Sequence, residues 1–183
     1  MAVMETRVLE ILGGKSVLRA ERPKVAGAPG KGRSRLARKP KAKAGEPVAA
    51  LSLGADVRVD PGESSWTDII RAGLPSVVLQ NLAENLHVSL SELSRSLRLP
   101  ERTLHRRLAQ GQWLTSEETE RNVRVARALA KAQQLLGEEN GRGWLLEPCR
   151  GLGSEQPIKM LDTADGFSAV MDELGRLEYG VIS

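Results

Sequence analysis

Apolar residues recur at spacings of three and four from Trp66 onward, which is the period of amphipathic helices. The stretch TDIIRAG, residues 67–73, predicts a first short helix, which the sequence Gly-Leu-Pro-Ser at 73–76 interrupts. Ser76 is predicted to cap a second helix, because serine is a preferred residue at that position. The apolar stripe of this second helix consists of Val78, Leu79, Leu82 and Leu86.

Two capping boxes mark the helices that follow. Ser89 precedes Glu92 by three residues, and Thr115 precedes Glu118 by the same spacing. The first box opens a short helix with Leu90, Leu93 and Leu97 on one face, after which Pro100 is predicted in the first turn of another helix. The second box opens the longest helix, about 116 to 136, which Gly137 ends. Its stripe of mostly small residues suits close helix packing: Val123, Ala126, Leu129, Ala130, Gln133 and Leu136.

The remaining segments are less regular. Residues 1–20 hold one short apolar cluster that Gly13-Gly14 breaks, so at most a short helix or strand with a turn is expected there. Residues 21–47 consist mainly of Lys, Arg, Ala, Gly and Pro without periodicity, which predicts a flexible segment. The tail reads as helical pieces: GWLLEP, PIKMLDT and GFSAVMDELGRLEYG. We divide the chain into residues 1–20, 21–65, 66–137 and 138–183.

Composition supports an all-α fold. Hydrophobic residues make up 40% of the 183 residues but aromatic residues only 3%, so the core must be aliphatic, which favours helices over a β-sandwich. The single cysteine, Cys149, excludes a disulfide within the chain and a Cys-based zinc site. No stretch approaches the roughly 18 apolar residues of a membrane span, and the N-terminus makes a poor signal peptide. We therefore expect a cytoplasmic protein with no membrane partner.

The charge is distributed unevenly along the chain. Residues 15–43 hold eleven basic residues and one acidic residue, whereas the rest holds 16 basic and 22 acidic residues. A basic arm on an acidic body is a pattern seen in nucleic-acid binders. The segment 21–47 is interpreted either as a solvated tether or as an arm that contacts phosphates, and the two interpretations are compatible.

Residues 89–110 have the length and arrangement of a helix-turn-helix, with a three-residue turn. At about 100° per residue, Leu104 and Leu108 define the buried face of the second helix. The outward side then carries Arg102, Arg106 and Gln110, with Thr103 near one edge, while His105 and Arg107 lie on opposite flanks. Guanidinium groups on such a face can bind guanine or phosphate. The spacing leaves an ordinary solvated basic helix open as the alternative, and Glu101 near the helix start could repel phosphate.

Catalytic chemistry finds little support. The sequence has no Ser/His/Asp set, no paired carboxylates placed by a motif, and no complete glycine-rich phosphate loop, since Gly13-Gly14-Lys15-Ser16 lacks the first glycine of a P-loop. The two histidines, His87 and His105, lie far in sequence from Cys149 and make no convincing metal set. We expect no enzyme activity, metal, cofactor or small-molecule substrate.

The C-terminal region adds a distinctive order of residues. It runs Trp144-Leu145…Pro148, Leu152-Gly153, Pro157…Leu161…Thr163…Gly166, Val170…Leu174-Gly175-Arg176…Tyr179-Gly180-Val181. Together with GLP at 73–75, RTLHRRLAQG at 102–111 and LTSEETER at 114–121, this order resembles the Xre/MbcA/ParS antitoxin family. The resemblance covers about Asp68 to Ser183.

This resemblance implies the antitoxin half of a type II toxin–antitoxin pair whose partner is a RES-domain toxin that destroys NAD. It implies an N-terminal helix-turn-helix bundle that forms a homodimer and binds operator DNA, and a small helical C-terminal domain that covers the toxin's active site. The implied DNA-binding residues are Arg102, Thr103, Arg106 and Arg107. The implied toxin-binding residues are Trp144, Pro148, Tyr179, Gly180, Val181, Ile182 and Ser183.

Some residues depart from the family pattern. The basic segment 21–47 is longer than expected, Cys149 stands where a polar or small residue is usual, and Pro100 replaces a polar cap. Trp144 and Tyr179 could be core residues instead of interface anchors. A stand-alone transcriptional regulator without a toxin remains the alternative function.

Overall fold

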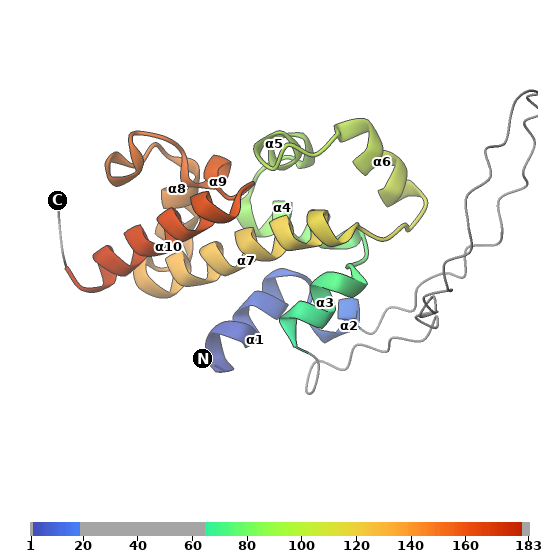
Figure 1. The fold of residues 1–183 in the computed structure, drawn as a ribbon, viewed down its shortest axis with the longest axis horizontal. Helices are drawn as coiled ribbons and strands as arrows, with labels where there is room; N and C mark the ends of the chain where they lie inside the picture. Colours follow the sequence, from blue (N-terminus) through green and yellow to red (C-terminus); the bar gives the residue numbers. More distant parts are fainter. Residues whose placement is uncertain (1, 19–64, 181–183) are drawn as a thin grey trace, which may run out of the picture.

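The computed structural model of the chain describes residues 2–18 and 65–180, which form helices joined by loops (Figure 1). The basic segment 21–47 and residues 181–183 lie outside this described part. The helices are α1 (Ala2–Ile11), α2 (Lys15–Leu18), α3 (Trp66–Ala72), α4 (Val77–Leu86), α5 (Leu90–Ser96), α6 (Glu101–Ala109), α7 (Ser116–Leu136), α8 (Glu138–Leu146), the 3-10 turn η1 (Arg150–Leu152), α9 (Pro157–Met160) and α10 (Ala164–Glu178). The predicted all-α fold class is confirmed, since the described residues contain no strand.

The long helix α7 is the centre of the fold. Helices α1, α3, α4, α8 and α10 all pack against it, and α10 runs alongside it (Figure 1). Val123, Ala126 and Leu129 of α7 are at most 1% exposed, as the predicted stripe requires. The core around them is aliphatic, with small side chains on α7 that let its neighbours approach closely.

Both predicted capping boxes are confirmed. The Ser89 hydroxyl accepts a hydrogen bond from the Glu92 backbone N–H, and the Glu92 carboxylate accepts one from the Ser89 backbone N–H. Thr115 and Glu118 form the same reciprocal pair at the start of α7. Because these bonds satisfy backbone donors that have no partner inside a helix, they fix where α5 and α7 begin.

The predicted cap at Ser76 is wrong in its chemistry. Ser76 does precede α4, but its side chain makes no capping hydrogen bond and its backbone is helical, with a φ of −60°. The Ser76 hydroxyl instead donates to the carbonyl oxygen of Arg107 in α6, at 3.3 Å. Ser76 is 2% exposed, so this hydroxyl serves a tertiary contact between α4 and α6.

Two boundaries also differ from the prediction. The link between α5 and α6 spans residues 97–100, one residue more than expected, and Pro100 is the N-cap of α6 and lies before its first turn. Helix α8 begins at Glu138, ahead of the predicted piece at Gly143, with two acidic residues in its first turn. Those acids face the positive end of the helix dipole, which helps the helix begin there.

The N-terminal cluster forms helices, within the range that the sequence allowed. Gly13 and Gly14 separate α1 from α2 with φ angles of 110° and 74°, which glycine adopts readily. The Asn81 side chain of α4 donates to the carbonyl oxygen of Leu12 at 3.0 Å, so this segment is attached to the body of the fold. No helix in residues 2–18 or 65–180 is long and apolar enough to cross a bilayer.

Candidate functional site

The outward face of α6 carries two exposed guanidinium groups. Arg102 and Arg106 are exposed, Thr103 is half-buried, and Leu104 is buried at 1%. Leu108, which was expected to be buried with Leu104, is only half-buried. Within the described residues, neither Arg102 nor Arg106 forms an ion pair with a carboxylate. Both cationic groups are therefore available to a phosphate or to the edge of a base.

The one acidic residue of α6 is held against α5. The Ser91 hydroxyl of α5 donates to the Glu101 carboxylate, and His105 lies one turn along α6 with its Nε2 3.7 Å from that carboxylate. The hydrogen bond from Ser91 is the main cause of a pKa for Glu101 below its ordinary value. The Glu101 carboxylate therefore links the start of α6 to α5.

Arg107 is placed differently from the other three predicted DNA-binding residues. Its guanidinium pairs with the Glu118 carboxylate at the start of α7, and the two side chains are only 16% and 12% exposed. Burial raises the pKa of Glu118, but hydrogen bonds from the Thr115 backbone and from Arg107 outweigh it and hold the pKa below its ordinary value. The geometry turns Arg107 toward α7 and separates it from the exposed face of Arg102 and Arg106.

The predicted toxin-binding residues in the C-terminal half differ in how deeply they are buried. Trp144 of α8 is half-buried and packs against the core, whereas Pro148 is exposed. Tyr179 follows α10 and is 82% exposed, and Gly180 beside it has a φ of 68°. Tyr179 is thus no core residue, while Trp144 has a core contact. Val181, Ile182 and Ser183 lie outside the described residues.

Sequence reasoning missed Leu177, which is 39% exposed and two positions before Tyr179. It continues the apolar spacing of Val170 and Leu174 on α10, so the pattern alone places it in the core. The end of α10 is fixed by Lys131 of α7, whose Nζ lies 2.5 Å from the Glu178 carboxylate. Leu177 and Tyr179 are two exposed large hydrophobic residues at the C-terminal end of α10, and we call this end the α10 tip.

The loops of the C-terminal half are fixed locally. The Thr163 hydroxyl accepts a hydrogen bond from the Gly166 backbone N–H at 3.1 Å and caps α10. A Cβ on Gly166 would collide with the carbonyl of Met160, so α9 and α10 meet here at close range. The Cys149 thiol is half-buried and free, and its backbone N–H donates to Glu155 across a short bridge at 3.0 Å.

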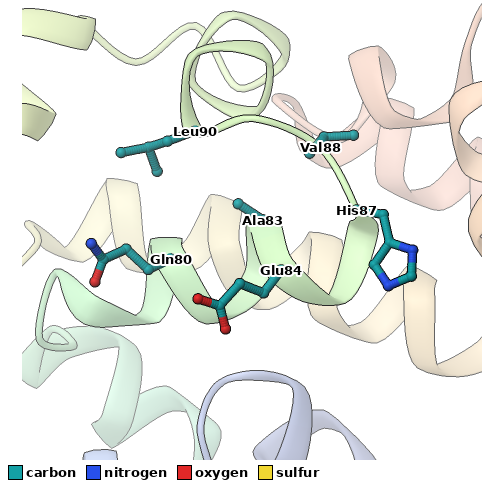
Figure 2. Close-up of a pocket in the computed structure, with 6 residues that line it drawn as sticks. All are labelled: Gln80, Ala83, Glu84, His87, Val88 and Leu90. Atoms are coloured by element: carbon teal, nitrogen blue, oxygen red, sulfur yellow. The ribbon is translucent and has the colours of Figure 1, made fainter.

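An open depression of about 540 Å³ lies at the end of α4 (Figure 2). Its lining residues are Gln80, Ala83, Glu84, His87, Val88 and Leu90, as Figure 2 shows. His87 Nε2 lies 3.3 Å from the Arg142 guanidinium of α8. None of the predicted site residues lines it. Across the described ranges, no three His, Cys, Asp or Glu side chains gather closely enough to hold a metal ion.

Two family models match the chain. Residues 65–127 match the antitoxin Xre-like helix-turn-helix domain, and residues 131–180 match the antitoxin Xre/MbcA/ParS C-terminal toxin-binding domain. The first match ends and the second begins inside α7, which spans Ser116–Leu136.

Curated relatives agree with the family models. Antitoxin Xre of Yersinia enterocolitica is 34% identical over 118 residues, which covers 63% of this chain and 80% of the relative. Antitoxin Xre of Photorhabdus laumondii is 29% identical over 117 residues, with 63% and 79% of the two chains covered. A protein named Prs ADP-ribosylating antitoxin, from Sphingobium, is 27% identical over 125 residues, again with 63% and 79% covered.

Proposed function

Because this chain belongs to the Xre/MbcA/ParS family of antitoxins, we propose that it neutralises a RES-domain toxin that degrades NAD and represses its own operon. In this proposal, residues 138–183 cover the toxin's active site, and the protein, as a homodimer in the cytoplasm, binds operator DNA through α6. The antitoxin itself performs no catalysis and holds no cofactor.

The observation that carries the proposal is the separation of two exposed surfaces along α7. The basic face of α6 lies at one end of α7 and the α10 tip at the other (Figure 1). With 21 residues, α7 is about 30 Å long. The two exposed surfaces are therefore separate, which favours an antitoxin that also acts as a repressor over a stand-alone regulator.

A second candidate for the toxin's chemistry comes from the Sphingobium relative, whose name refers to ADP-ribosylation of Prs. ADP-ribosylation takes its ADP-ribose from NAD, so both candidate toxins use the same nucleotide. Expression of the neighbouring toxin gene distinguishes them, because a degrading enzyme empties the NAD pool whereas a transferase labels a protein.

The antitoxin role is tested by coexpression with that toxin. We expect the wild-type chain to restore growth and the Tyr179→Ala variant to bind the purified toxin at least about tenfold more weakly, since exposed aromatic anchors often dominate interfaces. Val77→Ala is the matched control, because Val77 is 41% exposed but lies on α4. No growth rescue by the wild-type chain would refute the antitoxin role, and equal binding by the Tyr179 variant would move the toxin surface elsewhere.

The repressor role is tested with a labelled duplex of the DNA directly upstream of the chain's own reading frame. Arg106→Gln should weaken binding by about 1 kcal/mol or more and lower the slope of affinity against salt by about one. Arg150→Gln serves as the control, because Arg150 is exposed on η1, in the C-terminal half. If both variants bind like the wild type at fixed salt, α6 does not contact DNA.

A further inference from the structure

The ion pair between Arg107 and Glu118 joins α6 to α7 in a largely buried setting. One oxygen of the Glu118 carboxylate accepts from the Arg107 guanidinium and, at 2.8 Å, from the Thr115 backbone N–H. The same carboxylate thus caps α7 and fastens α6. A charge pair this well shielded from water, with further hydrogen bonds, is costly to break by removing one partner.

The backbone of Arg107 is held as well as its side chain. Its carbonyl oxygen accepts from the Ser76 hydroxyl, and the Ser76 backbone N–H donates to the carbonyl of Gln112 at 3.1 Å. Two residues further on, the Leu114 N–H donates to Leu74 at 2.8 Å. The end of α6 is therefore tied to both α4 and α7 by polar contacts.

Apolar packing holds α6 only weakly. Leu104 is the one fully buried side chain of this helix in the described structure. The hydrogen bond from Ser91 to Glu101 holds the start of α6 against α5, so the polar ties at Arg107 fix its other end and thereby its angle. That angle decides where Arg102 and Arg106 point.

We propose that Arg107 and Glu118 are positioning residues, which hold α6 at the angle that presents Arg102 and Arg106 to DNA. The proposal rests on the proposed function, in which α6 binds the operator. It assigns to Glu118, an acidic residue near a DNA-binding surface, a role that favours DNA binding. It also removes Arg107 from the set that contacts DNA directly.

Two neighbouring glutamates make a matched test. Glu118→Gln removes the charge but keeps an acceptor that suits a capping box. Glu117→Gln removes the same charge one residue away, where the side chain is exposed and no partner is seen in the described residues. Simple electrostatics predicts slightly tighter DNA binding for both variants, because each loses a negative charge.

If Glu118 positions α6, the two substitutions should change DNA affinity differently from each other. With the upstream duplex at fixed salt, the full-length Glu118→Gln protein should bind at least about fivefold more weakly, because the uncompensated guanidinium no longer holds α6. The Glu117→Gln protein should bind as tightly as the wild type or more tightly. Equal behaviour of the two variants would overturn the proposal.

Salt dependence separates positioning from contact. Arg107→Gln should weaken binding yet leave the salt slope unchanged, whereas Arg106→Gln should lower the slope by about one. A slope that falls equally in both variants would mean that Arg107 touches phosphate, and the proposal would be wrong.

Amide hydrogen exchange gives a readout that needs no DNA. In the free full-length protein, residues 101–110 should exchange faster in Glu118→Gln than in Glu117→Gln, and by a larger factor than the amides of α10. If the wild type binds no upstream DNA, the proposed repressor role fails on its own. Unchanged exchange over 101–110 would instead refute the tie between α6 and α7.

Discussion

At the scale of single residues, Gly141 and Gly143 lie two positions apart in α8 and have different surroundings. A Cβ added to Gly141 would come within 2.5 Å of the Gln133 backbone nitrogen and 2.7 Å of the Ala132 carbonyl carbon. A Cβ on Gly143 would meet no atom within 4 Å. Gly141 is therefore the point at which α8 touches the backbone of α7, and Gly143 has no such role.

Alanine at these two positions should change stability in opposite directions. Gly141→Ala forces α8 away from α7, at about 1–3 kcal/mol, which exceeds the gain of about 1 kcal/mol in helix propensity. Gly143→Ala keeps the gain without the collision and should stabilise by up to about 1 kcal/mol. Urea unfolding of both variants measures the two values. A stabilised Gly141 variant would mean that the helices separate at no cost.

At the scale of helices, the sequence predicted those elements whose ends are chemically marked. The boxes at Ser89 and Thr115 and the glycine after α7 gave the starts of α5 and α7 and the end of α7 correctly, because capping is a local interaction. The predicted side-chain cap at Ser76 was wrong, because its hydroxyl binds the carbonyl of Arg107, which is distant in sequence and leaves no local pattern. The ion pair between Arg107 and Glu118 was not predicted for the same reason, because Glu118 belongs to another helix.

The cap of α7 should make stability depend on pH. The folded pKa of Glu118 lies below its ordinary value, so its contribution is fully present above the unfolded pKa and is lost as the pH falls through the folded pKa. At neutral pH, Glu118→Gln should unfold with a free energy on the order of 1–3 kcal/mol below the wild type.

Acidification should remove this difference. Below the folded pKa of Glu118 the wild-type side chain is itself uncharged, so the two proteins should converge in urea midpoint. Glu117→Gln is the control and should differ from the wild type by less than about 0.5 kcal/mol at every pH. A gap for Glu118→Gln that stayed constant on acidification would mean that its charge does not stabilise the cap.

At the scale of the whole molecule, one helix serves both halves. The predicted division at residue 137 gives all of α7 to the helix-turn-helix half, yet α8 and α10 pack on it as α1, α3 and α4 do. The periodicity of α7 showed that it had a buried stripe but not which elements cover it, because partners far along the chain leave no local signature. Asp162, before α10, adds direct links: its carboxylate lies 2.9 Å from Arg98 Nε, and its carbonyl accepts from Arg124.

Because both halves of the molecule pack on α7, we expect them to unfold together. Because neither half keeps its core without α7, the described body should unfold in urea as a single transition. Trp113 lies in the helix-turn-helix half, where it bridges to Pro75, and Trp144 lies on α8. Variants that retain only one of these tryptophans, with Phe at the other tryptophan positions, report on each half separately. In each variant, the fluorescence transition should coincide with the loss of helical circular dichroism.

Leu145→Ala tests the coupling directly, because Leu145 of α8 is fully buried and lies outside the helix-turn-helix half. Removal of its side chain should cost about 2–5 kcal/mol. If the halves unfold together, this substitution lowers the midpoint seen by Trp113 as much as the one seen by Trp144. A lower unfolding midpoint seen only by Trp144 fluorescence would show that the C-terminal half unfolds by itself. The two binding surfaces would then rest on independent units, and a toxin bound at the α10 tip could not stabilise α6 through α7.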